Sequence, residues 1–203
     1  SVFKQWRRGA EVASGDLLWI AEADDLAEPT FLEKLVHQYQ DSNVVMAFSQ
    51  SKQIDQDSVK LADDYKDYTS DIGDYWEEDY IIEGSDEIKR ALCVKNTIPN
   101  VSGAIFRRDS FKETMDKLDS ELAFLKVAGD WLVYLEILAK GKIAFVHESL
   151  NSHRRHTSSV TKKNNHLDEV ASIQERVSNQ WPISNTMKKK IDDYRVFLEN
   201  YFN

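Results

Sequence analysis

The sequence predicts an α/β protein in which a mostly parallel sheet is flanked by helices. Two short runs, 17–21 and 44–48, contain only apolar residues, which is typical of strands that are buried on both faces. The segment between them, 29–39, begins with Pro29 and then places apolar residues at helical spacing. A strand, a helix and a second strand in this order predict a parallel βαβ unit.

The rest of the chain continues with helices and strands. The spacing of apolar residues and the positions of Gly and Pro predict the remaining elements. These are helices at 2–13, 85–92, 110–118 and 131–139, strands at 101–106 and 142–147, and C-terminal helices before and after Pro182. We expect two regions, a sheet-containing region at 1–161 and a helical appendage at 162–203.

The composition excludes several classes of protein. No apolar run approaches the roughly 20 residues of a membrane-spanning helix. The single cysteine, Cys93, excludes an internal disulfide, and we expect it to be a small buried hydrophobe. The net charge is −9, and the segment 55–83 accounts for all of it with eleven acidic and two basic residues. This charge disfavours nucleic acid as a partner, and we interpret 55–83 as an irregular acidic insertion.

Three carboxylates follow the first apolar run within four residues. Glu22, Asp24 and Asp25 would lie at the carboxyl end of a strand, where ligands collect in open α/β sheets. Charges of one sign this close repel one another, and clustered oxygen ligands suit hard cations such as Mg²⁺ or Mn²⁺. Asp24 and Asp25 can equally cap the helix that follows. The pattern alone leaves both interpretations open.

Four ordered blocks of sequence resemble the family 2 glycosyltransferases, which have the GT-A fold. The first block, 3–25, ends in Glu-Ala-Asp-Asp, where the family usually has the Asp-x-Asp-Asp form of its DxD motif. The others are Val-Ser-Gly-Ala-Ile-Phe-Arg-Arg at 101–108, Gly-Asp-Trp at 129–131 with the apolar helix and strand after it, and His-Arg-Arg-His-Thr-Ser-Ser-Val-Thr at 153–161. The order and spacing of the blocks carry the resemblance, because each block is short.

The resemblance implies both a fold and a reaction. The fold is an incomplete GT-A-like, Rossmann-like sheet, and the reaction transfers a sugar from a nucleotide-diphosphate donor to an acceptor hydroxyl with inversion at the anomeric carbon. We expect a UDP-sugar donor, a glycan or lipid-linked acceptor, and a setting in cell-surface polysaccharide synthesis. By match to the motif, Asp24 binds Mg²⁺ or Mn²⁺, Glu22 faces the donor ribose and the metal, and Asp25 supports Asp24.

Asp130 matches the position of the family's catalytic carboxylate. The resemblance therefore implies that Asp130 is the base that removes the proton of the acceptor hydroxyl. The same resemblance places Ser102, Gly103 and Trp131 on the acceptor side of the site. Gly129 stands where family members often have a second acidic residue. From the pattern alone Asp130 can also be the N-cap of the helix that follows, and one residue can have both roles.

A basic cluster follows the last predicted strand. The resemblance places His156 at the donor diphosphate or its metal, and Arg155 and Ser159 at phosphate oxygens. His153 and His156 do not predict a zinc site, because the chain has no cysteine pair to complete one. The cluster can also be a solvated basic loop that offsets the acidic insertion.

The tryptophans fall into two groups. Trp6, Trp19 and Trp131 lie on predicted apolar faces, so we expect them in the core. Trp76 lies in the acidic insertion, where it can stack on an acceptor sugar or anchor the loop. An alternative function stays open, namely a non-catalytic domain that keeps the fold and binds a partner protein through the insertion and the C-terminal helices.

One part of the family pattern has no counterpart in this sequence. Family members have a strand-helix-strand portion ahead of the position matched by Ser1, and that portion supplies much of the nucleotide pocket. We therefore expect the chain alone to be inactive and to bind UDP with Mn²⁺ weakly. We also expect an exposed sheet edge that favours a homo-oligomer, and a cytoplasmic location, with any membrane association provided by other parts of the parent protein.

Overall fold

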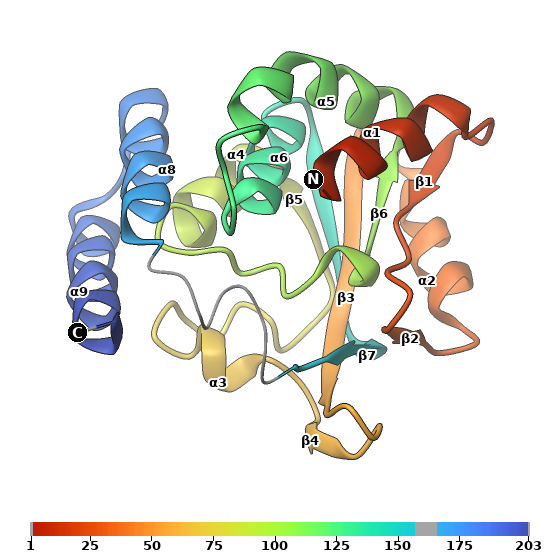
Figure 1. Ribbon diagram of the computed structural model, residues 1–203, viewed down its shortest axis with the longest axis horizontal. Helices are drawn as coiled ribbons and strands as arrows, with labels where there is room; N and C mark the ends of the chain where they lie inside the picture. The colour runs from red at the N-terminus through yellow and green to blue at the C-terminus, as the bar shows by residue number, and fades with distance from the viewer. Residues whose placement is uncertain (1, 157–165, 203) are drawn as a thin grey trace.

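A seven-stranded sheet forms the centre of the computed structural model, which describes residues 2–156 and 166–202 (Figure 1). Five strands follow one another across the sheet in the order β1 (Leu17–Trp19), β6 (Ala104–Arg107), β3 (Val44–Ile54), β7 (Lys142–Arg154) and β2 (Leu26–Ala27). Two more pair beside this path, β4 (Lys60–Ala62) with β3 and β5 (Tyr80–Glu83) with β7.

The predicted α/β architecture is confirmed, but the sheet is mixed rather than mostly parallel. Among the described strands, β3 and β7 form the one parallel pair, and the other five pairings are antiparallel. β1 and β3 run in the same direction, as the predicted βαβ unit requires, but β6 lies between them and is antiparallel to both. Periodicity could not reveal this insertion, because the intervening strand comes more than 50 residues later in the chain.

Helices cover both faces of the sheet. On one face, α2 (Phe31–His37) packs its Phe31 and Leu35 against apolar residues of β3 and β7. The other face carries α1 (Val2–Val12), α5 (Arg108–Leu122) and α6 (Gly129–Leu138) in a larger core (Figure 1). The α6 helix is apolar nearly all round because it lies between the sheet and other helices. The shorter helical segments are η1 (Gln38–Gln40), α3 (Lys66–Thr69), α4 (Gly84–Glu87), η2 (Ile88–Leu92) and η3 (Val101–Gly103).

The two C-terminal helices extend this larger core. α8 (Leu167–Gln180) and α9 (Asn185–Phe202) contribute Val170, Ile173 and Leu198 to the same apolar cluster as the sheet. They lie side by side at one end of the molecule (Figure 1). Within the described residues, no helix combines the length and the apolar character needed to cross a membrane.

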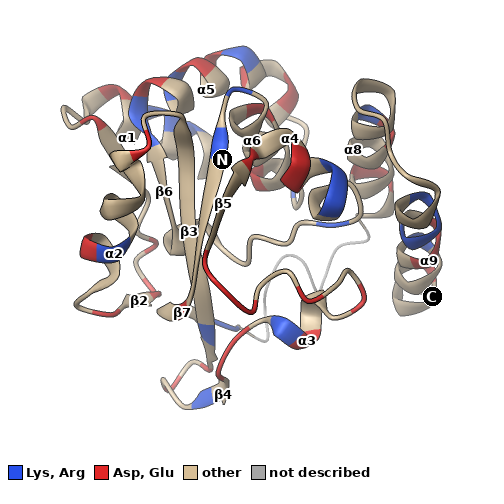
Figure 2. Cartoon of the chain, turned by 180° about the vertical axis from the view of Figure 1, so that it is seen from behind, with Lys and Arg blue, Asp and Glu red and all other residues tan. Residues whose placement is uncertain are grey.

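The acidic insertion is anchored by buried aromatic side chains. Figure 2 shows its Asp and Glu residues along the loops that connect β4, α3 and β5. Trp76 is 3% exposed, so the interpretation of this residue as an anchor of the loop is confirmed. Outside the insertion, Trp6, Trp131 and Cys93 are buried, as expected, whereas Trp19 is only partly buried and packs on Phe31.

Gly84 allows two backbone segments to approach closely. Its N–H donates to the carbonyl oxygen of Gly141 at 2.9 Å. A β-carbon at position 84 would lie 2.1 Å from the carbonyl oxygen of Leu138, at the end of α6. The approach joins α4 to the end of the helix that carries Asp130, so a side chain at this position must displace backbone.

We predict that Gly84→Ala lowers the free energy of unfolding by about 2 kcal/mol or more, because the contact atoms are backbone and cannot rotate away. Gly9→Ala is the matched control: Gly9 lies in α1 and a β-carbon there meets nothing within 4 Å. The control variant should gain about 0.5–1 kcal/mol from its higher helix propensity. Urea denaturation measures both changes, and equal unfolding midpoints for the two variants would contradict the prediction.

Candidate active site

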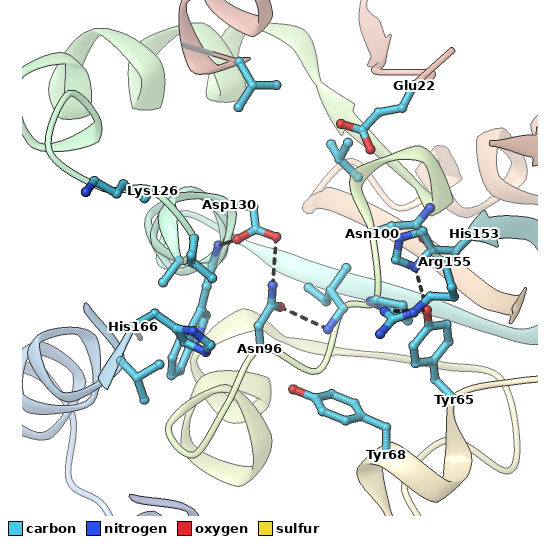
Figure 3. A pocket seen from close by; sticks show the side chains of 18 of the residues that line it. Glu22, Tyr65, Tyr68, Asn96, Asn100, Lys126, Asp130, His153, Arg155 and His166 are labelled. Carbon is cyan, nitrogen blue, oxygen red and sulfur yellow. Dashed lines mark hydrogen bonds between the residues drawn. The ribbon is translucent and has the colours of Figure 1, made fainter. Parts of the chain in front are cut away.

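A cavity of about 630 Å³ lies between α6, the segment 96–101, the acidic turn after β1 and the end of β7 (Figure 3). Two carboxylates face it from opposite walls, Asp130 from the first turn of α6 and Glu22 from the acidic turn. The polar lining also includes three amide side chains, Gln53, Asn96 and Asn100. Its cationic, imidazole and tyrosine side chains are Lys126, His153, Arg155, His166, Tyr65, Tyr68, Tyr194 and Tyr201. The cavity therefore brings together residues from the family-like motifs, the acidic insertion and both C-terminal helices.

Asp130 is oriented by two hydrogen bonds. The side-chain amide of Asn96 donates to one carboxylate oxygen at 3.0 Å, and the backbone N–H of Trp131 donates to the other at 2.7 Å. Burial raises the pKa of Asp130 to about 6, although these two bonds act in the opposite direction. The N-cap of α6 is Ala128, and Asp130 is the second residue of the helix. Asp130 is thus not the N-cap, which corrects that interpretation of the sequence.

The carboxylate of Glu22 is unusually basic. Burial raises its pKa to about 7, and the charges of Asp25, Asp24 and Asp130 contribute to the same shift. Its backbone N–H donates to the hydroxyl of Ser102 at 3.0 Å, while the carbonyl of Ser102 accepts from the indole N–H of Trp19 at 2.8 Å. Ser102 is 1% exposed, so it supports the turn from the interior of the protein.

Asp25 is part of a buried network of amides. One of its oxygens accepts from the side chain of Asn100 at 2.7 Å, and the other accepts from the backbone N–H of Arg154 at 2.8 Å. The same Asn100 amide donates to the Oδ1 atom of Asn151 at 2.9 Å, and the hydroxyl of Ser51 lies within 3.2 Å of both amide oxygens. This network connects the acidic turn to β3 and β7 through the buried side chains of Asn100, Ser51 and Asn151.

Asp24 pairs with a second residue of the family-like motifs. Its carboxylate lies 2.8 Å from Nε2 of His156, and this hydrogen bond is the main reason why the pKa of Asp24 is lowered. The following helix, α2, has Thr30 as its N-cap and no side-chain cap. The alternative that Asp24 and Asp25 cap this helix is therefore wrong.

The acidic insertion reaches the cavity through Tyr65. Its hydroxyl is hydrogen-bonded to Nδ1 of His153 at 2.5 Å and accepts from the guanidinium of Arg155 at 3.3 Å. Burial lowers the pKa of His153, so the ring is held in its neutral form beside Arg155. Arg155 lines the cavity, and Ser159 lies outside the described residues.

The remaining predicted residues take supporting positions. Gly103 is buried beside Asn100 and Ser51, where a β-carbon would lie 3.1 Å from each of their oxygen atoms. Trp131 is 2% exposed and lines the cavity, and its indole N–H donates to the carbonyl of Leu92 at 3.0 Å. Ser102 and Gly103 do not belong to the cavity lining, and Ser102 contacts the acidic turn through its hydrogen bond with the N–H of Glu22.

The donor atoms present suit a metal that is shared with a bound phosphate. Within residues 2–156 and 166–202, no group of three or more His, Cys, Asp or Glu side chains could hold a metal ion. Asp24 and His156 offer two ligands side by side. Mg²⁺ is commonly held by one or two carboxylates together with substrate phosphates, and the Asp24 carboxylate fits this pattern. The imidazole of His156 is a less usual ligand for such hard cations.

Sequence reasoning missed several residues that hold the predicted ones. Asn96 donates a hydrogen bond to Asp130, and Asn100 donates one to Asp25. The Tyr65 hydroxyl is hydrogen-bonded to His153. The available signal was the polar stretch Lys95-Asn96-Thr97 with Asn100, immediately before a predicted strand. Such a stretch reads as a loop, and its partners cannot be identified without the fold.

Comparison with known proteins identifies the family. The model of glycosyl transferase family 2 matches residues 2–115, which is more than half of the chain. The chain belongs to the family 2 glycosyltransferases. No curated protein matches it. The family implies a nucleotide-sugar donor and an acceptor, and its members generally use divalent metal ions. In this glycosyltransferase the match includes the acidic turn and Asn100, while Asp130 and His156 lie beyond it.

We predict that Asp130→Asn makes the protein more stable than the wild type at pH 7, by about 1–2 kcal/mol. Burial raises this pKa from 3.8 to about 6, so the folded state binds the proton more tightly and stability falls as pH rises from about 4 to about 6. The full shift corresponds to about 3 kcal/mol, and the open cavity reduces it. Urea denaturation at pH 4 and pH 7 measures the difference between variant and wild type.

The matched control for this prediction is Asp109→Asn. Asp109 is the second residue of α5, as Asp130 is of α6, but its side chain is 79% exposed. Its effect on stability should be small at both pH values. If the difference in the free energy of unfolding between Asp130→Asn and wild type does not change with pH, the prediction is wrong, because Asp130 is then not buried enough to shift its pKa.

Proposed function

We propose that this glycosyltransferase is a metal-dependent, inverting enzyme and that the described cavity is the place of sugar transfer. The observation that carries the proposal is the position of Asp130 and the acidic turn on opposite walls of one cavity (Figure 3). A volume of about 630 Å³ lies in the range of small-molecule sites and leaves room for a sugar between the two walls.

Asp130 is the proposed general base. In a direct displacement, the acceptor hydroxyl oxygen bonds to the anomeric carbon while the bond from that carbon to the diphosphate oxygen breaks. The hydroxyl proton passes to the carboxylate of Asp130, which Asn96 and the N–H of Trp131 hold in place. A pKa of about 6 leaves the carboxylate ionised at pH 7 and makes it more basic than an ordinary aspartate.

Asp24 and His156 are the proposed ligands of Mg²⁺ or Mn²⁺. When bound, the metal would act as a Lewis acid that neutralises the charge growing on the leaving diphosphate. Arg155, which lines the cavity, provides charge-assisted hydrogen bonds to phosphate oxygens. Asp25 holds the turn through Asn100 and the N–H of Arg154, and in this proposal it supports Asp24.

Glu22 is the proposed contact to the donor ribose. It lines the described cavity and also a second one of about 780 Å³, which α1, β1 and the acidic turn enclose. A pKa of about 7 allows its carboxyl group to donate as well as accept hydrogen bonds to hydroxyl groups near neutral pH. We propose that the nucleoside lies on the side of this second cavity and the acceptor on the side of Asp130.

The resemblance to the family supports further features of the proposal. These are a UDP-sugar as donor, a glycan or lipid-linked acceptor, and a cytoplasmic role in the assembly of cell-surface polysaccharide. The tyrosine rings of the cavity lining agree with a sugar acceptor, because aromatic faces offer sugars an apolar contact surface beside polar groups.

We predict that Asp130→Asn in the full-length protein lowers kcat for sugar transfer by about 10²–10⁴-fold, which is the usual contribution of a general base. Asp24→Asn should raise the Mn²⁺ concentration needed for activity, because it removes one proposed ligand. Release of UDP from UDP-glucose, UDP-galactose and UDP-N-acetylglucosamine, with Mn²⁺ and a panel of glycan acceptors, measures both effects.

Asp109→Asn is again the control, since it alters an aspartate at the same helix position away from the cavity. It should retain wild-type activity. Transfer that survives both Asp130→Asn and Asp24→Asn would reject the proposed site. Binding of a partner protein without any transfer would instead favour the non-catalytic alternative.

A further inference from the structure

A carboxylate of the C-terminal region binds three successive backbone N–H groups next to Asp130. The N–H groups of Lys126, Val127 and Ala128 each donate to Glu169 of α8 at 2.9 Å. One carboxylate oxygen accepts from Lys126, and the other accepts from Val127 and Ala128. Successive N–H groups of this kind form a concave anion site. The last of the three belongs to Ala128, the N-cap of α6. Here the protein fills the site with its own side chain.

The same helix also holds the second segment that contacts Asp130. Gln174 of α8 is completely buried, and its side-chain amide donates to the carbonyl oxygen of Val94 at 2.6 Å. Val94 lies two residues before Asn96, which donates to the Asp130 carboxylate. Arg176 forms a third connection, an ion pair with Glu136 of α6 at 2.8 Å. Thus α8 contacts α6, the loop before it and the segment of Asn96.

Charge supports the same arrangement. Burial raises the pKa of Glu169, but its three N–H donors outweigh this effect and lower the pKa overall, so Glu169 is ionised at neutral pH. An anion at this point compensates the positive end of α6.

We propose that Glu169 is a positioning residue for sugar transfer, which fixes the loop before α6 and thereby aims Asp130 at the acceptor hydroxyl. The inference rests on the proposed role of Asp130 as base. It assigns a function to α8, a helix that lies outside the matched residues 2–115. Positioning of this kind has large kinetic effects, because small displacements of a catalytic group reduce the rate strongly.

The test compares Glu169→Gln with Glu175→Gln in the full-length protein. Both residues lie on α8, but Glu175 is exposed on its surface. Gln at position 169 keeps the shape of Glu and loses its charge and one acceptor. Hydrogen exchange of the peptide containing residues 126–128 reports on the loop, and steady-state UDP release from a UDP-sugar used by the wild type reports on kcat and KM.

For Glu169→Gln we expect faster exchange at these amides and a kcat lowered by about tenfold or more. The KM for the UDP-sugar should stay within about threefold, because the hydrogen bonds of Glu169 to Lys126, Val127 and Ala128 hold the loop before α6 and not the acidic turn. Glu175→Gln should match the wild type in every measurement. General destabilisation would instead speed exchange across the whole domain and would not separate kcat from KM.

Faster exchange at 126–128 together with a wild-type kcat would overturn the inference. If Glu169→Gln does not fold, Glu169→Asp is used instead, because Asp keeps the charge on a shorter side chain. A folded Glu169→Asp variant with faster exchange at 126–128 and an unchanged kcat would also overturn the inference. Failure of the proposed function gives a different result, because the Asp130→Asn variant would then keep its transferase activity. In that case the inference about Glu169 would also be wrong.

Discussion

The site depends on one buried hydrogen-bonded network, in which the amide of Asn100 joins Asp25 of the acidic turn to Asn151 of β7. The turn leaves β1 at one edge of this strand order, whereas β7 is separated from β1 by two strands, β6 and β3. Asn100 bridges this distance, and Ser51 and the N–H of Arg154 complete the network. Buried polar groups are costly unless they are paired, so the satisfied network favours a single geometry for the turn.

This constraint separates the three carboxylates of the turn into three roles. Asp25 accepts two hydrogen bonds and holds the backbone, and Asp24 pairs with His156. The Glu22 side chain faces the cavity. Their environments differ accordingly: the pKa of Asp24 is lowered by its hydrogen bond to His156, while burial raises that of Glu22 to about 7. Neighbouring acidic groups with divergent titration are a common feature of catalytic sites.

Much of the fold and part of the site could be predicted from the sequence. Apolar runs located β1 and β3, and the motifs singled out Glu22 and Asp130, which line one cavity, because these signals are local. The antiparallel position of β6 and the partners Asn96 and Asn100 were not predictable in the same way. They depend on contacts between segments that are 30 or more residues apart, and neither periodicity nor capping rules contain this information. Glu169 was missed for the same reason, because on α8 it resembles any surface glutamate.

The most direct test of the account is the position of a bound metal. Crystals of the full-length protein soaked with Mn²⁺ and UDP would locate the ion by its anomalous scattering. The account predicts one strong peak bound by the Asp24 carboxylate, His156 and the diphosphate, on the side of the acidic turn that faces Asp130. A peak elsewhere, with the hydrogen bond between Asp24 and His156 intact, would contradict it.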